Sequence, residues 1–162
     1  VKTHKTREIA RLLLDAGVTR HKCATVAEAE MLASAGAPDV LIAYPLVGPN
    51  LGRLVELVRR FPETRFSTLF DHPDATRALS AAVSAAGLTV GAVLDLNVGQ
   101  NRTGIAVGDN AVSLSGTASS RRSRRAAAAI LVASRSPRVR HAAMTVASRS
   151  TEWLARSCST RM

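Results

Sequence analysis

The sequence predicts an α/β fold in which short strands alternate with helices around a parallel sheet. Five apolar runs with strand character occur in the first 105 residues. Their starts lie roughly 20 to 25 residues apart, the length of one strand–helix unit. The runs are Val1–His4, His21–Ala24, Val40–Tyr44, Phe66–Phe70 and Val90–Leu96. Strands joined through helices pair in parallel with right-handed crossovers, which gives the α/β class, but periodicity leaves open whether the sheet closes.

The intervals between these strands carry the start and stop signals of helices. Thr6 is expected to cap the first helix, because its hydroxyl can accept a hydrogen bond from a free backbone N–H. Thr25 and Glu28 form a capping box at the start of the second helix, and Pro73 opens the fourth. The apolar face predicted for the first helix consists of Ile9, Leu12, Leu13 and Ala16.

The composition changes sharply after Leu114. The whole chain has a net charge of +10, yet residues 1–114 hold 12 basic and 11 acidic side chains. Residues 115–162 hold 10 Arg and one acid, Glu152, together with 10 Ser and 10 Ala. We therefore divide the chain into a domain at 1–114 and a basic tail at 115–162. The tail is either a disordered arm or the product of a frame shift in a GC-rich gene, and we favour the frame shift.

Other functional classes leave few signals in this sequence. No run of about 20 apolar residues is present, so we expect no membrane span. No secretory leader precedes the first strand, so we expect a cytoplasmic protein. Cys23 and Cys158 lie far apart, which indicates plain thiols and no zinc motif. The histidines match no metal motif, so we assign no metal site.

Two segments carry residues suited to chemistry. Period-two alternation puts Lys2 and His4 on one face of the first predicted strand, where a lysine among apolar walls loses its charge and can form a Schiff base. Arg102 lies between Gly99 and Gly104 after the fifth strand and could present its planar fork to a phenolate or carboxylate. Taken singly, an exposed strand-end lysine and a solvated loop arginine are the ordinary alternatives.

Taken together, four segments resemble the D-threonine aldolase/D-serine dehydratase branch of the alanine-racemase-like, fold type III enzymes that use pyridoxal phosphate. Lys2-Thr3-His4-Lys5 is similar to the lysine strand of that family, and Val98–Gly104 to its Gly-x-x-Arg-x-Gly loop. Cys23–Glu30 and Val47–Pro49 resemble family segments in the same order. The resemblance covers about residues 1 to 110. It implies a partial (β/α)8 TIM-type barrel of about five units, with the tail outside it.

The resemblance also implies roles for individual residues. Lys2 matches the lysine that forms the aldimine with pyridoxal 5'-phosphate and exchanges protons at the substrate Cα. Arg102 matches the arginine that hydrogen-bonds the phenolic oxygen of the cofactor, and His4 matches a histidine with a supporting, cofactor-side role. The sequence departs from the family at Asn97, where Asp is common, and at Asn101, where Gly is usual.

The implied activity is retro-aldol cleavage of D-3-hydroxy-amino acids such as D-threonine, with dehydration of D-serine as the alternative in the same family. The family also uses a divalent metal, later barrel strands and a homodimer, and the residues that supply them have no counterpart here. We therefore expect the chain as given to be incomplete. An alternative from another class is a non-catalytic nucleic-acid-binding fragment that uses the basic tail, although Trp153 is the only aromatic residue there.

Overall fold

Helices and strands alternate along the chain in the computed structural model, which describes residue 1, residues 3–119 and residues 128–133. The helices are α1 (Arg7–Asp15), α2 (Val26–Ser34), α3 (Pro49–Arg60), α4 (Pro73–Ala85) and α5 (Asp109–Ser119). The strands are β1 (Arg20–Cys23), β2 (Asp39–Pro45), β3 (Arg65–Phe70), β4 (Gly91–Asn97), β5 (Ile105–Ala106) and β6 (Ala128–Ala133).

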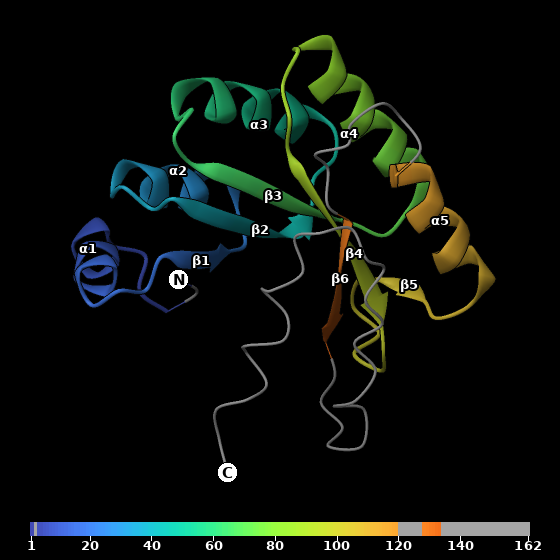
Figure 1. Cartoon of the computed structure of the whole chain (residues 1–162). Coiled ribbons are helices and arrows are strands. Elements are labelled where there is room, and N and C mark those ends of the chain that lie inside the picture. Colours follow the sequence, from blue (N-terminus) through green and yellow to red (C-terminus); the bar gives the residue numbers. More distant parts are fainter. Residues whose placement is uncertain (2, 120–127, 134–162) are drawn as a thin grey trace.

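The strands form one parallel sheet. β1, β2, β3 and β4 are neighbours in chain order, and the two-residue β5 and the strand β6 both pair in parallel with β4. The helices lie in an arc along the outer side of the strands (Figure 1). This arrangement is that of a partial (β/α)8 barrel and confirms the fold class predicted from the sequence.

The register of the sheet gives its two faces different chemistry. Lys22 pairs with Leu41, Leu41 with Ser67, and Ser67 with Gly91, so these positions share the inner face. Nearer the amino ends of the strands, Asp39 forms ion pairs with two arginines. Its Oδ2 lies 2.5 Å from Nη2 of Arg65 and 3.9 Å from Nε of Arg20. The inner face is therefore polar and charged over β1 and over the amino ends of β2 and β3.

The outer face of the sheet carries the hydrophobic core. Side chains from β1, β2 and β3 pack there against helices α1 to α4, and the fully buried members include Cys23, Val40, Ile42, Leu32 and Leu54. A second cluster joins Phe70 and Leu94 to Ala111 and Leu114 of α5. The layer between helices and sheet thus supplies the apolar burial that stabilises the fold.

The second helix confirms the predicted capping box with one change. The backbone N–H of Glu28 donates to Thr25 Oγ1 at 3.1 Å, as expected. The Glu28 carboxylate, however, accepts from the backbone N–H of Ala24 at 2.8 Å, one residue before the cap. Thr6 is the N-cap of α1 but its side chain makes no capping hydrogen bond, so that part of the prediction is wrong.

Two further predictions near the amino end are wrong. Residues 3 and 4 do not form a strand: Val1 donates its amino group to the carbonyl of Lys22 at 2.8 Å, and the chain then leads into α1. The buried side of α1 is marked by Ala10, fully buried, whereas Leu12 is 63% exposed and Ile9 36%. α1 packs against α2, and the contact with that neighbour decides which side of the helix is covered.

Parts of the predicted tail have regular structure. Helix α5 crosses the boundary expected at Leu114 and continues to Ser119, and the apolar run Ala128–Ala133 forms β6 against β4. Residues 120–127 and 134–162 lie outside the described residues, as does Cys158. In the described part of the chain, no helix has the length and apolar character needed to cross a membrane.

The two leucines Leu54 and Leu12 test which faces are buried. Leu54→Ala removes a fully buried side chain, so we expect it to lower the free energy of unfolding by about 2–5 kcal/mol. Leu12→Ala removes an exposed side chain and should change it by less than about 0.5 kcal/mol. Urea unfolding followed by circular dichroism measures both, and equal losses would contradict the described packing of α1.

Candidate active site

Parallel strands place their carboxyl ends at one edge of the sheet, and the candidate residues follow those ends. Arg102 lies in the loop between β4 and β5, directly after the carboxyl end of β4 at Asn97. Its side chain is exposed, and within the described part of the chain no hydrogen bond or ion pair joins its guanidinium to another residue. Arg102 is therefore available to an anionic group at this edge, where barrel sites lie.

Asn97 organises the first half of the Arg102 loop. Its Oδ1 accepts hydrogen bonds from the backbone N–H groups of Gly99 at 3.2 Å and Asn101 at 3.1 Å. Its Nδ2 donates to Asn101 Oδ1 at 3.1 Å. Asn101 adopts a positive φ of 51°, which asparagine tolerates better than most residues. The two departures from the family pattern are thus direct partners, and together they shape the turn before Arg102.

Two aspartates fix the second half of the loop. Thr103 Oγ1 donates to Asp95 Oδ2 at 2.9 Å, and the backbone N–H of Gly104 donates to Asp71 Oδ2 at 2.9 Å. Gly104 has a φ of 98°, and a Cβ there would lie 2.6 Å from the backbone nitrogen of Asn97. A side chain at this position would therefore force the loop away from β4.

Asp95 is a buried carboxylate directly below this loop, only 4% exposed. Burial raises its pKa, and the negative charge of Asp71 raises it further. The hydrogen bond from Thr103 and the charges of Arg102 and Lys22 act in the opposite direction. Lys22 lies on β1, which β2 and β3 separate from β4 in the sheet order, so its charge acts on Asp95 from across the inner face.

The predicted site residues lie at different places on this edge. Lys2 lies outside the described residues. His4 is exposed in the segment between Val1 and α1, and within the described part of the chain no hydrogen bond or ion pair joins it to Arg102. Sequence reasoning missed Asp71 and Asp95, which carry no motif of their own and are recognised only by what they contact.

Neither Cys23 nor His21 belongs to the candidate site around the Arg102 loop. Both point to the outer face of β1, and burial raises the pKa of the Cys23 thiol to about 12, so it is a plain thiol as predicted. His21 is buried, and its Nε2 has no hydrogen-bond partner in the described part of the molecule. Among the described residues, no group of three or more His, Cys, Asp or Glu could hold a metal ion.

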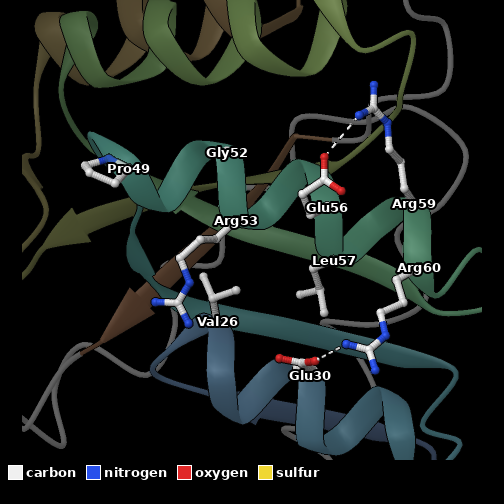
Figure 2. Close-up of a pocket in the computed structure, with 9 residues that line it drawn as sticks. All are labelled: Val26, Glu30, Pro49, Gly52, Arg53, Glu56, Leu57, Arg59 and Arg60. Atoms are coloured by element: carbon white, nitrogen blue, oxygen red, sulfur yellow. Dashed lines mark hydrogen bonds and ion pairs between the residues drawn. The ribbon is translucent and has the colours of Figure 1, made fainter.

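A groove of about 780 Å³ lies between α2 and α3 (Figure 2). No residue of the Arg102 loop is among those that line it. Its walls hold two ion pairs, Glu30 with Arg60 at 2.6 Å and Glu56 with Arg59 at 3.1 Å. Arg53 lies 3.5 Å from the Asn50 side chain. The groove is open and its charges are mostly paired, so it offers no arrangement of groups for catalysis.

Comparisons with known proteins agree with this architecture. The family profile of the alanine racemase N-terminal domain matches residues 1–124. Over 105 residues the chain is 32% identical to a D-threonine aldolase of an Arthrobacter species, a match that covers 64% of this chain and 27% of that protein. The crystal structure of D-threonine aldolase from Filomicrobium marinum is similar with a TM-score of 0.71 and 34% identity. That match covers 80% of this chain and 34% of the other, so the chain spans about a third or less of either relative.

The raised pKa of Asp95 predicts how stability depends on pH. Because the folded chain holds this proton more tightly than the unfolded chain, the stabilisation is complete below the ordinary aspartate pKa and is lost as pH rises through the raised one. Asp95→Asn should remove this downward slope of the free energy of unfolding. Thr103→Val, which deletes the hydrogen bond that lowers the pKa, should move the slope to higher pH. Urea unfolding at pH 3 to 8 measures how the free energy of unfolding changes with pH. If Asp95→Asn kept the wild-type slope, the slope would not come from Asp95.

Two glycines of the loop separate steric contact from backbone conformation. Gly104→Ala and Gly99→Ala both place a side chain at positive φ, but only at Gly104 does the new Cβ meet backbone atoms. We expect Gly104→Ala to lower the free energy of unfolding by about 2–4 kcal/mol and Gly99→Ala by about 1–2 kcal/mol. Denaturant titration measures the difference, and losses of the same size would mean that the loop is not held against β4.

Proposed function

Because the chain belongs to the family of the alanine racemase N-terminal domain, we propose that it is the first part of a pyridoxal-phosphate-dependent carbon–carbon lyase. The proposed reaction is cleavage of D-3-hydroxy-amino acids, such as D-threonine to glycine and acetaldehyde. The similarity to two D-threonine aldolases favours this reaction over the dehydration of D-serine. The observation that carries the proposal is the Arg102 loop, held at the carboxyl end of β4 by contacts on both sides of the arginine.

The residues around Arg102 fit a cofactor with a phenolate oxygen. The guanidinium is exposed, and contacts of the neighbouring Asn101, Thr103 and Gly104 hold its backbone in place. A cation held in this way can donate to a negative oxygen with little further loss of conformational freedom. Arg102 would thus bind the phenolic oxygen, as the motif predicted. The remaining contacts of such a cofactor would come from strands beyond those described.

When bound, pyridoxal 5'-phosphate withdraws electrons from the Cα of an amino acid, so that a bond to Cα can break. In the proposed cleavage, a base in the part of the protein beyond this chain would take the proton of the 3-hydroxyl. The Cα–Cβ bond then breaks, its electron pair stays with Cα, and the aldehyde leaves. Cα then gains a proton to give glycine. We assign that proton to the amine of Lys2, which would also attach the cofactor, and a supporting role beside it to His4.

The complete activity depends on more chain than is present here. The chain spans 27% of one D-threonine aldolase and 34% of the other. We propose that the remaining barrel strands, the divalent metal and the partner subunit of a family-type homodimer belong to the part of the protein beyond this chain. The part described here would supply the lysine motif and Arg102 as one folded unit.

Cofactor binding to the chain tests the proposal, with Arg102→Leu as the decisive variant. Loss of a charge-assisted hydrogen bond is expected to weaken binding of pyridoxal 5'-phosphate about 10- to 100-fold, measured by absorbance titration. Arg53→Leu removes an exposed arginine from the groove between α2 and α3 and should bind as the wild type does. Equal weakening by both variants would mean non-specific attraction of the phosphate.

The substrate class is tested with the complete protein. D-Threonine is expected to give acetaldehyde and glycine, measured in a coupled aldehyde assay, and Lys2→Ala should abolish this activity. Pyruvate and ammonia from D-serine, with no aldehyde from D-threonine, would instead identify the dehydratase of the same family.

A further inference from the structure

Glu28 joins three separate parts of the chain. It lies in the first turn of α2, and its side chain is only 9% exposed. One carboxylate oxygen accepts the backbone N–H of Ala24, at the carboxyl end of β1, at 2.8 Å. The other lies 3.0 Å from Nζ of Lys5, the last residue of the lysine motif. A buried carboxylate with both oxygens occupied is a fixed point in the structure.

The two contacts of Glu28 do more than cap its helix. In a capping box, the glutamate returns to the N–H of the capping residue itself. Glu28 instead bonds one residue further back, at Ala24, and extends to Lys5 in the segment before α1. The same helix contains Glu30, which pairs with Arg60 at 2.6 Å while 42% exposed. Glu30 is thus an ordinary surface partner, whereas Glu28 connects the lysine motif to β1.

The lysine motif is held on both sides of Lys2. On one side, the amino group of Val1 donates to the carbonyl of Lys22 in β1 at 2.8 Å. On the other side, Lys5 is paired with Glu28. The pKa of Glu28 is lowered, chiefly by the backbone N–H of Ala24 and also by Lys5, although burial opposes this. The carboxylate therefore stays ionised at neutral pH, and the pair keeps its charges.

We propose that Glu28 and Lys5 are positioning residues that hold the segment carrying the lysine motif in place beside β1. The inference rests on the proposed function for the identity of the reactive lysine. It explains why two separate motifs, Lys2–Lys5 and Cys23–Glu30, occur in the same chain: the second supplies the carboxylate that fixes the first.

The first measurement needs no cofactor. Backbone 15N order parameters of Thr3 to Thr6 should fall from about 0.85 in the wild type towards about 0.6 in Glu28→Gln and in Lys5→Met. Lys5→Arg, which keeps the ion pair, should retain the wild-type values. Glu30→Gln is the matched control, since it breaks an ion pair on the same helix, and should also retain them. Lys5 is 62% exposed, so Lys5→Met should unfold at the same temperature as the wild type.

The second measurement is the rate at which borohydride traps a pyridoxyl group on Lys2 after pyridoxal 5'-phosphate is added. It should fall about threefold or more in Glu28→Gln and Lys5→Met but not in Lys5→Arg or Glu30→Gln. The proposal would be overturned if Glu28→Gln and Lys5→Met kept the wild-type order parameters or trapped the pyridoxyl group at the wild-type rate. It would also be overturned if Glu30→Gln changed these quantities as much as Glu28→Gln does. If the order parameters fall but the wild type traps nothing on Lys2, the ion pair still holds the segment and the proposed function fails instead.

Discussion

Parallel pairing of β1 to β4 is the constraint on which the rest of the structure depends. It brings the carboxyl ends of strands that are far apart in sequence to one edge of the sheet. Asp71, after β3, can therefore accept the N–H of Gly104, after β4, across 33 positions of sequence. The bond between Glu28 and the backbone N–H of Ala24 is local, because the two residues lie four positions apart at the start of α2. The contact between Asp71 and Gly104, by contrast, exists because the register of β3 and β4 is fixed.

The two faces of the sheet have different roles: the outer face stabilises the fold, and the inner face carries charged groups. The outer face is apolar and covered by helices, and it holds the core around Val40, Ile42 and Leu54. The inner face carries Lys22 and Asp95, and the charge of Lys22 acts to lower the pKa of Asp95. Charged groups on an inner face need partners or solvent, so the inner face contributes less to stability and more to the electrostatics beneath Arg102.

Much of the fold could be predicted because its signals are local. Four of the five predicted strand starts, the capping pair Thr25–Glu28 and the opening of α4 at Pro73 follow from neighbouring residues, and each is found close to where it was expected. The exposed side of α1 could not be predicted, because the contact with α2 decides that Ala10 is buried and Leu12 is not. The run Val1–His4 has strand composition, yet among its described residues only Val1 forms a hydrogen bond with β1.

The candidate site was predictable only in part, for the same reason. Arg102 was found from its flanking glycines and from family resemblance, both of which are sequence patterns. Asp71 and Asp95 act through contacts with Gly104 and Thr103 that no spacing rule encodes. The departures at Asn97 and Asn101 looked independent in sequence, and only the hydrogen bond between their side chains shows that they are one feature.

The three lysines of the chain, Lys2, Lys5 and Lys22, offer the most direct test of the central proposal, because each carries an amine that can react with an aldehyde cofactor. Lys5 is held by Glu28, and Lys22 lies exposed on the inner face. The measurement is mass-spectrometric mapping of the pyridoxyl group after pyridoxal 5'-phosphate and borohydride are added to the folded chain. Among the three lysines, a label on Lys2 alone is expected. A label on Lys22 or Lys5, or an even distribution over all of them, would contradict it.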